Sequence, residues 1–354
     1  MAKSKKKSGL VKIILAVLVL LIAGAAFVAY DFYKKIYKPN IKLSTGQDYT
    51  FIYIPTGANF ETVIKLLTDE NLLSNRASFE WLAQTKGYVN NVKPGRYRIK
   101  RNMSNNELIN HLKAGLQEPV QLSLHNIRTK KQLINRVSIK LEASADELNK
   151  LLNDDNYLSQ NFGLNKHTIL TMFIPDIYQF YWNTSAEDFL KRMADEYKKF
   201  WTPDRKAKAK ALNLSQSEVS ILASIVQAEQ QLRKDERPII AGLYLNRLRM
   251  GMRLESDPTL VFAHGDFSIK RVYNIHKEIE SPYNTYKYAG LPPGPILIPE
   301  INSIDAVLNA AKHNYLFMCA KEDFSGYHNF ARTLDEHNIN AARYRKELNR
   351  RGIK

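Results

Sequence analysis

Glu229 is the residue whose type and spacing best suit acid–base chemistry in this sequence. It falls four residues after Ile225 and seven after Leu222, so in a helix its carboxyl lies on the same face as these apolar side chains. Burial disfavours the charged form of a carboxyl group and raises its pKa, which suits a proton donor near neutral pH. The alternative is a carboxylate at a helix end that reaches water or pairs with Arg233 or Arg247.

Two polar residues that follow Glu229 could hold a ligand. Asn246 and Arg247 offer an amide and a fixed guanidinium, which suit hydroxyl, acetamido or carboxylate groups. No His, Asp or Glu cluster has the spacing of metal ligands, so we expect neither a metal nor another cofactor.

The elements that must position these residues can be read from local patterns. Ser215 and Glu218 form a capping-box pattern, which predicts a helix from there to about Gln231. A second helix is expected from Arg237–Pro238 to about Gly251. Beyond it the sequence predicts a turn at Asp257–Pro258, a rigid irregular loop pair over 281–296, strands at 316–318 and 327–330, and a basic terminal helix over 334–348.

The N-terminal part of the chain predicts a membrane anchor. Residues 13–30 form an 18-residue stretch without a charge, enough to span about 27 Å of hydrocarbon as a helix. Eight Lys and one Asp lie in residues 1–38, and most of these Lys precede the stretch, so the N-terminus is expected to stay in the cytoplasm. A cleaved signal peptide is the alternative, because small residues occur at 23–26. The bulky aromatic residues that follow favour an uncleaved anchor.

Composition and element patterns predict an α+β protein with two domains outside the membrane. The chain has 354 residues, a formal charge of +17 and a single cysteine, Cys319, which excludes an internal disulfide framework. A small α+β module is expected from strands at 51–54 and 96–99 and from helices that begin after Asn59 and Ser104. The expected organisation is a basic tail (1–12), an anchor (13–30), a connector (31–47), the small module (48–155) and a larger α+β domain (156–354).

Several motifs together resemble one protein family. They are ASIVQAE at 223–229, LNRLRMGMRLESDPT at 245–259, YNTY at 283–286, GLPPGPI at 290–296 and HNF at 328–330. The sequence resembles the endolytic murein transglycosylases of the MltG/YceG-like family from about Phe51 to the C-terminus. It departs from that pattern at Gln227, where relatives often carry an acidic residue, in MFIPDIY at 172–178 and at 124–126.

The resemblance implies a lyase that cuts peptidoglycan strands within the chain, between N-acetylmuramic acid and N-acetylglucosamine, and leaves a 1,6-anhydro end. It implies a single catalytic acid, Glu229, and a LysM-like small module. Residues expected to hold or orient the sugar are Asn246, Arg247, Asp257, Tyr283, Asn284, Thr285, Tyr286 and His328. The implied location is the bacterial cytoplasmic (inner) membrane, as a single-pass protein with its catalytic domain outside the cytoplasm. There it would limit the length of nascent strands and could meet peptidoglycan synthases or division proteins.

Two readings from other classes remain open. A non-catalytic scaffold could be anchored by residues 13–30 and grip glycan through the small module. A basic body also suits nucleic acid, because residues 39–354 carry about +10. Against nucleic acid, the sequence has neither a glycine-rich RNA motif nor a regular basic stripe with interleaved aromatic residues, and we expect no nucleic-acid partner.

Overall fold

The computed structural model describes residues 4–352 of the 354-residue chain. The expected basic tail, residues 1–12, therefore falls partly outside the described residues. The described chain divides into two compact units, of which the first contains residues up to Val120 together with Phe180–Asn183 and the second contains Gln121–Gln179 and Thr184 onward. Each unit has both helices and strands, which confirms the α+β class.

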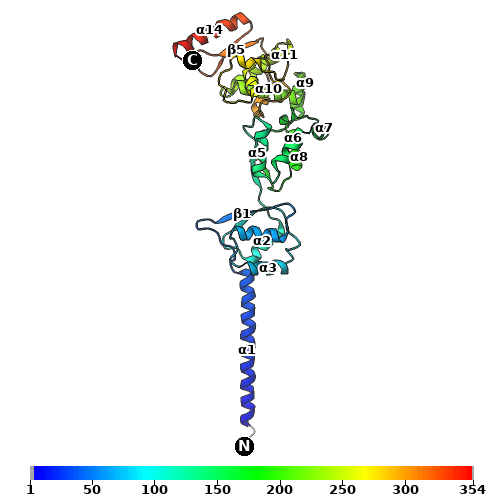
Figure 1. Ribbon diagram of the computed structural model, residues 1–354, viewed down its shortest axis with the longest axis vertical. Helices are drawn as coiled ribbons and strands as arrows, with labels where there is room; N and C mark the ends of the chain where they lie inside the picture. Colours follow the sequence, from blue (N-terminus) through cyan, green and yellow to red (C-terminus); the bar gives the residue numbers. More distant parts are fainter. Residues whose placement is uncertain (1–3, 353–354) are drawn as a thin grey trace. The chain divides into compact units, whose positions relative to one another are not determined.

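A long helix, α1 (Ser4–Tyr37), opens the first unit (Figure 1). Its segment Gly9–Tyr37 is long and apolar enough to cross a membrane, with a mean hydropathy of 2.9, and it includes the expected span over residues 13–30. The C-terminal end of α1 packs on the small module, where the rings of Phe32 and Trp81 lie 5.4 Å apart.

The small module pairs two antiparallel strands with three helices. Its elements are β1 (Tyr49–Ile54), α2 (Phe60–Asp69), α3 (Arg76–Thr85), β2 (Gly95–Lys100) and α4 (Asn105–Ala114). Ile52 on β1 lies opposite Tyr97 on β2, and the inward side chains of both strands and all three helices form one apolar core. The side chains of Asn59 and Ser104 accept hydrogen bonds from the first turns of α2 and α4, which confirms both expected helix starts.

The second unit is mainly helical. Its first part contains β3 (Val120–Ser123), α5 (Lys130–Lys140), α6 (Ala145–Asn153), α7 (Asp155–Phe162), η1 (Ile169–Met172), β4 (Ile177–Phe180), α8 (Ala186–Phe200) and α9 (Pro203–Ala211). Its second part contains α10 (Gln216–Glu229), η2 (Lys234–Glu236), α11 (Arg237–Arg249), α12 (Asp257–His264), η3 (Asn274–Glu278), α13 (Ile301–Leu308), β5 (Phe317–Ala320), β6 (His328–Ala331) and α14 (Leu334–Arg350). The strands pair as β3 with β4 and β5 with β6.

Two local expectations differ from the structure. The expected turn at Asp257–Pro258 is the first turn of α12, because Pro has no N–H to lose and its fixed φ suits this position of a helix. The boundary between the two units along the chain also falls at Val120, whereas the small module was expected to end at residue 155. Leu122, Leu124 and Ile127 are fully buried, and the carbonyl of Ile127 accepts a hydrogen bond from the N–H of Ile298 at 2.8 Å. These contacts attach the segment after Val120 to the second unit.

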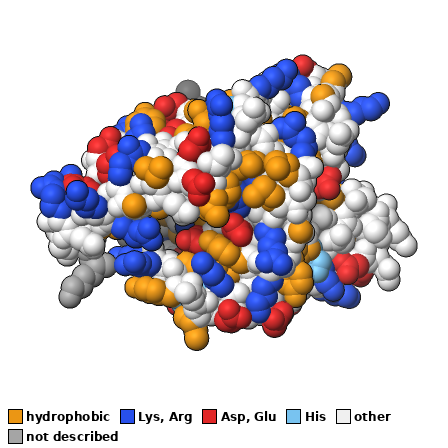
Figure 2. Space-filling model, turned by 90° about the horizontal axis from the view of Figure 1, so that it is seen from above, with side chains coloured by type: hydrophobic (Ala, Val, Ile, Leu, Met, Phe, Trp, Pro, Cys, Tyr) orange, Lys and Arg blue, Asp and Glu red, His pale blue; other side chains and the backbone are white. Residues whose placement is uncertain are grey.

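Basic side chains are spread over the surface. On the face shown in Figure 2, Lys and Arg occur in several separate groups, with acidic and hydrophobic side chains between them. On that face the positive charge therefore does not form the continuous stripe that tracks a nucleic-acid backbone.

Candidate active site

Helix α10 is enclosed by other elements of the second unit, and this enclosure determines the environment of Glu229. The helix contacts η1, α9, α11, α12 and α13, and every residue from Val219 to Val226 is buried. The expected capping box at Ser215 and Glu218 is present, which confirms the helix start. Glu229 is the last residue of α10, so it lies where this apolar core reaches the surface.

The Glu229 carboxyl is held by two hydroxyl groups. Its Oε1 accepts hydrogen bonds from the Tyr244 hydroxyl on α11 at 2.7 Å and from the Ser256 hydroxyl before α12 at 2.5 Å. Among the described residues, no donor lies within hydrogen-bonding distance of Oε2. Burial raises the pKa of Glu229 above its usual value, and the two hydroxyl donors oppose this shift without reversing it. Burial therefore favours the neutral, proton-carrying form of Glu229, and Oε2 has no hydrogen-bond donor among the described residues.

The alternative of an ion pair with an arginine does not match the geometry. The Arg233 guanidinium donates to the carbonyl of Ser325 at 2.7 and 2.9 Å. The Arg247 guanidinium pairs with Glu255 at 3.0 Å. Both arginines are thus bound elsewhere, and Glu229 lacks the cation that would stabilise its charged form.

One buried carboxylate, Glu236, forms a network of hydrogen bonds near the end of α10. Glu236, which is only 5% exposed, accepts hydrogen bonds through Oε2 from the Gln230 amide at 2.7 Å and through Oε1 from the His328 N–H at 2.9 Å. The Nδ1 atom of His328 also lies 2.9 Å from Glu236 Oε2. His328 is therefore hydrogen-bonded to Glu236. Its effect on Glu229 is electrostatic and slightly lowers the pKa of that carboxyl.

The segment before α12 is fixed by the loop that carries YNTY. The Ser256 N–H donates to the Thr285 hydroxyl at 3.0 Å, which holds Ser256 in position to bond Glu229. The Tyr286 hydroxyl donates to Asp257 at 2.6 Å. Asn284 is fully buried, and its amide donates to the carbonyls of Lys277 and Ile279, so it shapes the loop.

A groove of about 470 Å³ opens at Glu229. Its walls come from the end of α10 and from the β5–β6 hairpin, and they include Gln231, Leu232, Tyr327 and His328. This volume lies within the range of sites that bind small organic groups. The groove therefore brings a carboxyl with a raised pKa and an imidazole to the same open surface.

Asn246 and Arg247 lie inside the protein and not in this groove. The Asn246 amide donates to the carbonyls of His313 and Tyr315 at 2.8 and 3.0 Å. Arg247 donates to the carbonyls of Leu316 and Leu254. Tyr283, by contrast, is partly exposed and packs on Phe262, with ring centroids 4.8 Å apart.

Comparison with known proteins identifies the family of this chain. The sequence model of the YceG-like family matches residues 52–343, which is most of the chain. The chain belongs to the YceG-like family. The endolytic murein transglycosylase of Bacillus subtilis (strain 168) is 28% identical to this YceG-like chain over 308 residues, which cover 83% of this chain and 84% of that protein.

Further relatives agree with this assignment. The endolytic murein transglycosylase of Streptococcus pneumoniae serotype 2 (strain D39) is 26% identical over 330 residues, which cover 85% of this chain and 59% of that longer protein. The crystal structure of a YceG-like protein from Listeria monocytogenes has a TM-score of 0.56 and 24% identity, and the match covers 82% of this chain and 98% of that one. That structure confirms the fold.

Gln227 has a structural role in this YceG-like chain. Its Oε1 accepts hydrogen bonds from the N–H of Glu300 at 2.6 Å and from the Ser303 hydroxyl at 3.0 Å. The side chain therefore fixes the start of α13 against α10, and its carbonyl oxygen is already occupied by these donors.

Three residues of the site were missed by reasoning from the sequence. Tyr244 lies within the helix that was expected from Arg237–Pro238 to about Gly251, and a buried tyrosine carries a hydroxyl that needs a partner. Ser256 and Glu236 carried no local signal, because they approach Glu229 and His328 only after the chain folds back. The tyrosine on the next helix was the sequence feature that could have indicated a hydrogen-bond partner for Glu229.

Proposed function

We propose that this protein is an endolytic murein transglycosylase that cuts glycan strands between N-acetylmuramic acid and N-acetylglucosamine, with Glu229 as its single catalytic carboxyl. The observation that carries the proposal is that Glu229, whose pKa is raised by burial, lines a groove. The named relatives support it, because they are endolytic murein transglycosylases.

One carboxyl is sufficient for a reaction that does not use water. Glu229 gives its proton to the glycosidic oxygen as the bond to C1 of the muramic acid breaks and an oxocarbenium-like centre forms. The Glu229 carboxylate then takes the proton of the C6 hydroxyl while that oxygen bonds to C1, which yields the 1,6-anhydro ring and restores the acid. Because the nucleophile belongs to the same sugar, the second step is intramolecular and gains the advantage of proximity.

Other residues of the site also have roles in this scheme. Tyr244 and Ser256 hold Oε1, and their donated hydrogen bonds stabilise the carboxylate between the two steps. Asp257, Tyr286 and His328 are the sugar contacts, while Asn246, Arg247, Asn284 and Thr285 support the framework. Tyr283 packs on Phe262.

In this proposal the enzyme is anchored in a membrane, which the long apolar helix of the first unit supports. Helix α1 is a single-pass anchor of the bacterial cytoplasmic membrane, with the N-terminus inside and the small module and the second unit outside. The small module is a LysM-like glycan binder that presents nascent strands. Cutting close to the membrane would limit strand length and bring the enzyme near peptidoglycan synthases and division proteins.

The test is product analysis with the full-length chain in detergent micelles. Purified sacculi treated with the wild-type protein are expected to release fragments with 1,6-anhydro ends, identified by mass spectrometry. Glu229→Gln removes the proton donor but keeps the size of the side chain, and we expect a loss of roughly 10²- to 10⁴-fold in rate. Glu218→Gln on the first turn of the same helix is the matched control.

Either of two results would reject the proposal. Anhydro products formed by Glu229→Gln at the wild-type rate would remove Glu229 from the chemistry. Binding of intact glycan without any product from the wild-type protein would identify a non-catalytic scaffold.

A further inference from the structure

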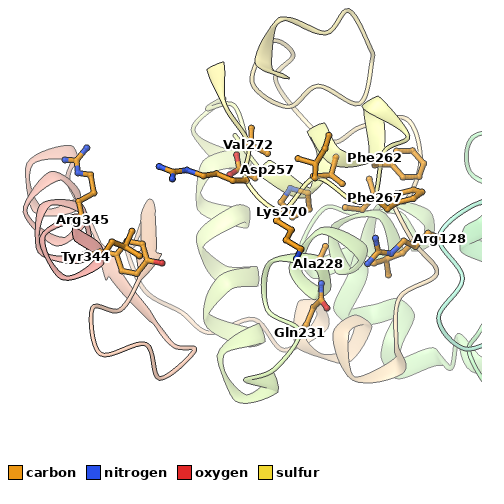
Figure 3. Close-up of a pocket in the computed structure, with 17 residues that line it drawn as sticks. Arg128, Ala228, Gln231, Asp257, Phe262, Phe267, Lys270, Val272, Tyr344 and Arg345 are labelled. Atoms are coloured by element: carbon orange, nitrogen blue, oxygen red, sulfur yellow. The ribbon is translucent and has the colours of Figure 1, made fainter. Parts of the chain in front are cut away.

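A second hollow adjoins the Glu229 groove. It has a volume of about 810 Å³ and shares Ala228, Gln231 and Tyr344 with the groove, so the two hollows meet at the end of α10. Figure 3 shows Tyr344 and Arg345 on α14 at one side, and Asp257, Phe262 and Lys270 from α12 and the loop after it at the other. The reaction proposed above gives no role to most of these residues.

The hollow is strongly basic. Arg128, Lys270, Arg271 and Arg345 line it, and Asp257 is its single acidic residue. Within residues 4–352, none of these four cations forms an ion pair, so their charges are available to a ligand. We call this hollow, as defined by these five residues, the basic pocket.

Apolar side chains also line the hollow that contains the basic pocket. Phe262, Phe267 and Ile296 line it, and the guanidinium of Arg128 lies over the Phe267 ring at 5.1 Å from its centroid. A sugar polymer without acidic groups has no carboxylates for the cations, and a phosphate polymer has little use for apolar lining residues. A short peptide with small side chains and free carboxylates matches both features.

We propose that the basic pocket binds the peptide carried by the muramic acid of murein, through the free carboxylates of that peptide. The proposal rests on the proposed function. The peptide is attached through the lactyl group of the same sugar whose C1 reacts, so it must leave the groove close to the catalytic carboxyl. Ser256, which donates a hydrogen bond to Glu229, immediately precedes Asp257 of the pocket. A peptide that leaves the sugar beside Glu229 can therefore enter the basic pocket directly.

The experiment compares strands with and without peptides. The full-length chain in detergent micelles is given uncrosslinked glycan strands that carry peptides, and the same strands after an amidase has removed the peptides. The test variant is Lys270→Gln/Arg345→Gln. The matched control is Lys346→Gln, an exposed cation next to Arg345 that does not line the pocket.

The expected result is a change in KM that depends on the peptide. The wild-type protein should have a lower KM for peptide-bearing strands, and the double variant should raise that KM roughly fivefold or more with kcat unchanged. Its KM for stripped strands should stay at the wild-type value, and Lys346→Gln should leave both values unchanged. High salt should remove the wild-type preference, because exposed charges are screened.

Other outcomes overturn the proposal. Equal losses on both substrates would mean that the cations act on the glycan, and no loss on either would leave the pocket without a role in binding. A glycerol-phosphate polymer that binds more tightly than a muramoyl peptide, with binding lost in the double variant, would assign the pocket to phosphate polymers.

A binding measurement separates this proposal from the proposed function. Fluorescence anisotropy of a labelled muramoyl peptide reports on the pocket without any reaction. If the wild-type protein cuts neither substrate, the proposed function fails, and weaker peptide binding by the double variant still supports the pocket. If the wild-type protein cuts strands but does not bind the peptide, only the pocket proposal fails.

Discussion

The Glu229 carboxyl is subject to two opposing influences. Burial favours its neutral form, whereas the hydrogen bonds from Ser256 and Tyr244 favour its charged form, and burial has the larger effect because the pKa is raised. A general acid works only while it is protonated. We therefore expect kcat/KM to be highest below this raised pKa and to fall as the pH rises through it, in a pH profile measured on glycan strands. A profile that increases over this range would contradict the role of Glu229 as the proton donor.

The same shift makes the stability of the protein depend on pH. The native state holds the Glu229 proton more tightly than the unfolded chain, in which a glutamic acid titrates near about 4.3. This contribution to stability is complete below the unfolded pKa and is lost as the pH rises through the folded pKa. Glu229→Gln removes that dependence, so its melting temperature relative to the wild-type protein should increase with pH. A difference that stays constant with pH would contradict the raised pKa.

Substitution of Asp257 tests how a nearby charge affects the pKa of Glu229. Its negative charge contributes to the raised pKa of Glu229, after the larger effect of burial. Asp257→Asn should therefore lower that pKa and move the alkaline fall of kcat/KM to lower pH. Tyr286→Phe is the control, because it removes the 2.6 Å hydrogen bond to Asp257 but leaves the charge in place. If both variants move the alkaline fall equally, the hydrogen bond and not the charge is responsible.

At the scale of elements, Glu236 fastens the β5–β6 hairpin to the end of α10. It lies at the end of η2 and bonds both the backbone and the imidazole of His328 at the start of β6. Glu236→Gln keeps the size of the side chain but weakens the hold on His328, so we expect kcat to fall roughly 10- to 100-fold through misplacement of the imidazole.

A purely structural role for Glu236 predicts a different result. In that case the melting temperature would fall and the remaining folded protein would keep the wild-type kcat. Measurement of kcat, KM and melting temperature on the same samples distinguishes the two cases. His328→Gln should reproduce the kcat loss of Glu236→Gln, and the two losses should not add if both act through the imidazole.

The sequence determined elements better than it determined contacts between them. Caps such as Ser215 with Glu218 are local, so they marked the start of α10 correctly. The apolar spacing around Ile225 also placed Glu229 at a buried edge. The partners of Glu229 could not be derived in this way, because Tyr244 and Ser256 belong to other elements. Polar residues such as Asn246 looked available to a ligand, and only the fold shows that backbone carbonyls occupy them.

At the scale of the whole molecule, the division into units depends on contacts that are distant in sequence. The small module was expected to end at residue 155, yet this position lies within the second unit. Residues Phe180–Asn183 return to the first unit, where the Trp182 ring lies 5.2 Å from that of Tyr53. A discontinuous unit of this kind leaves no signal in local composition.

The anchor helix and the small module share a buried polar link that should make them move together. Asn105 is 1% exposed, and its amide donates to the carbonyl of Lys35 near the end of α1 and to the Ser78 hydroxyl, each at 2.9 Å. Asn40 in turn donates to the Asn105 side-chain oxygen at 2.6 Å. A carbonyl in the last turn of a helix lacks a partner within the helix, so Asn105 satisfies a group that would otherwise be unpaired.

Asn105→Ala should therefore release α1 from the module and destabilise the first unit by about 1–3 kcal/mol, the usual effect of leaving buried polar groups unpaired. Spin labels at Phe27→Cys and Leu116→Cys, two exposed positions, would report the coupling in a Cys319→Ser background. We expect a narrow distance distribution in the parent protein and a broad one after Asn105→Ala, while the exposed Asn90→Ala leaves it narrow. A narrow distribution in Asn105→Ala would show that the aromatic contact between Phe32 and Trp81 is enough to fix the module to its anchor.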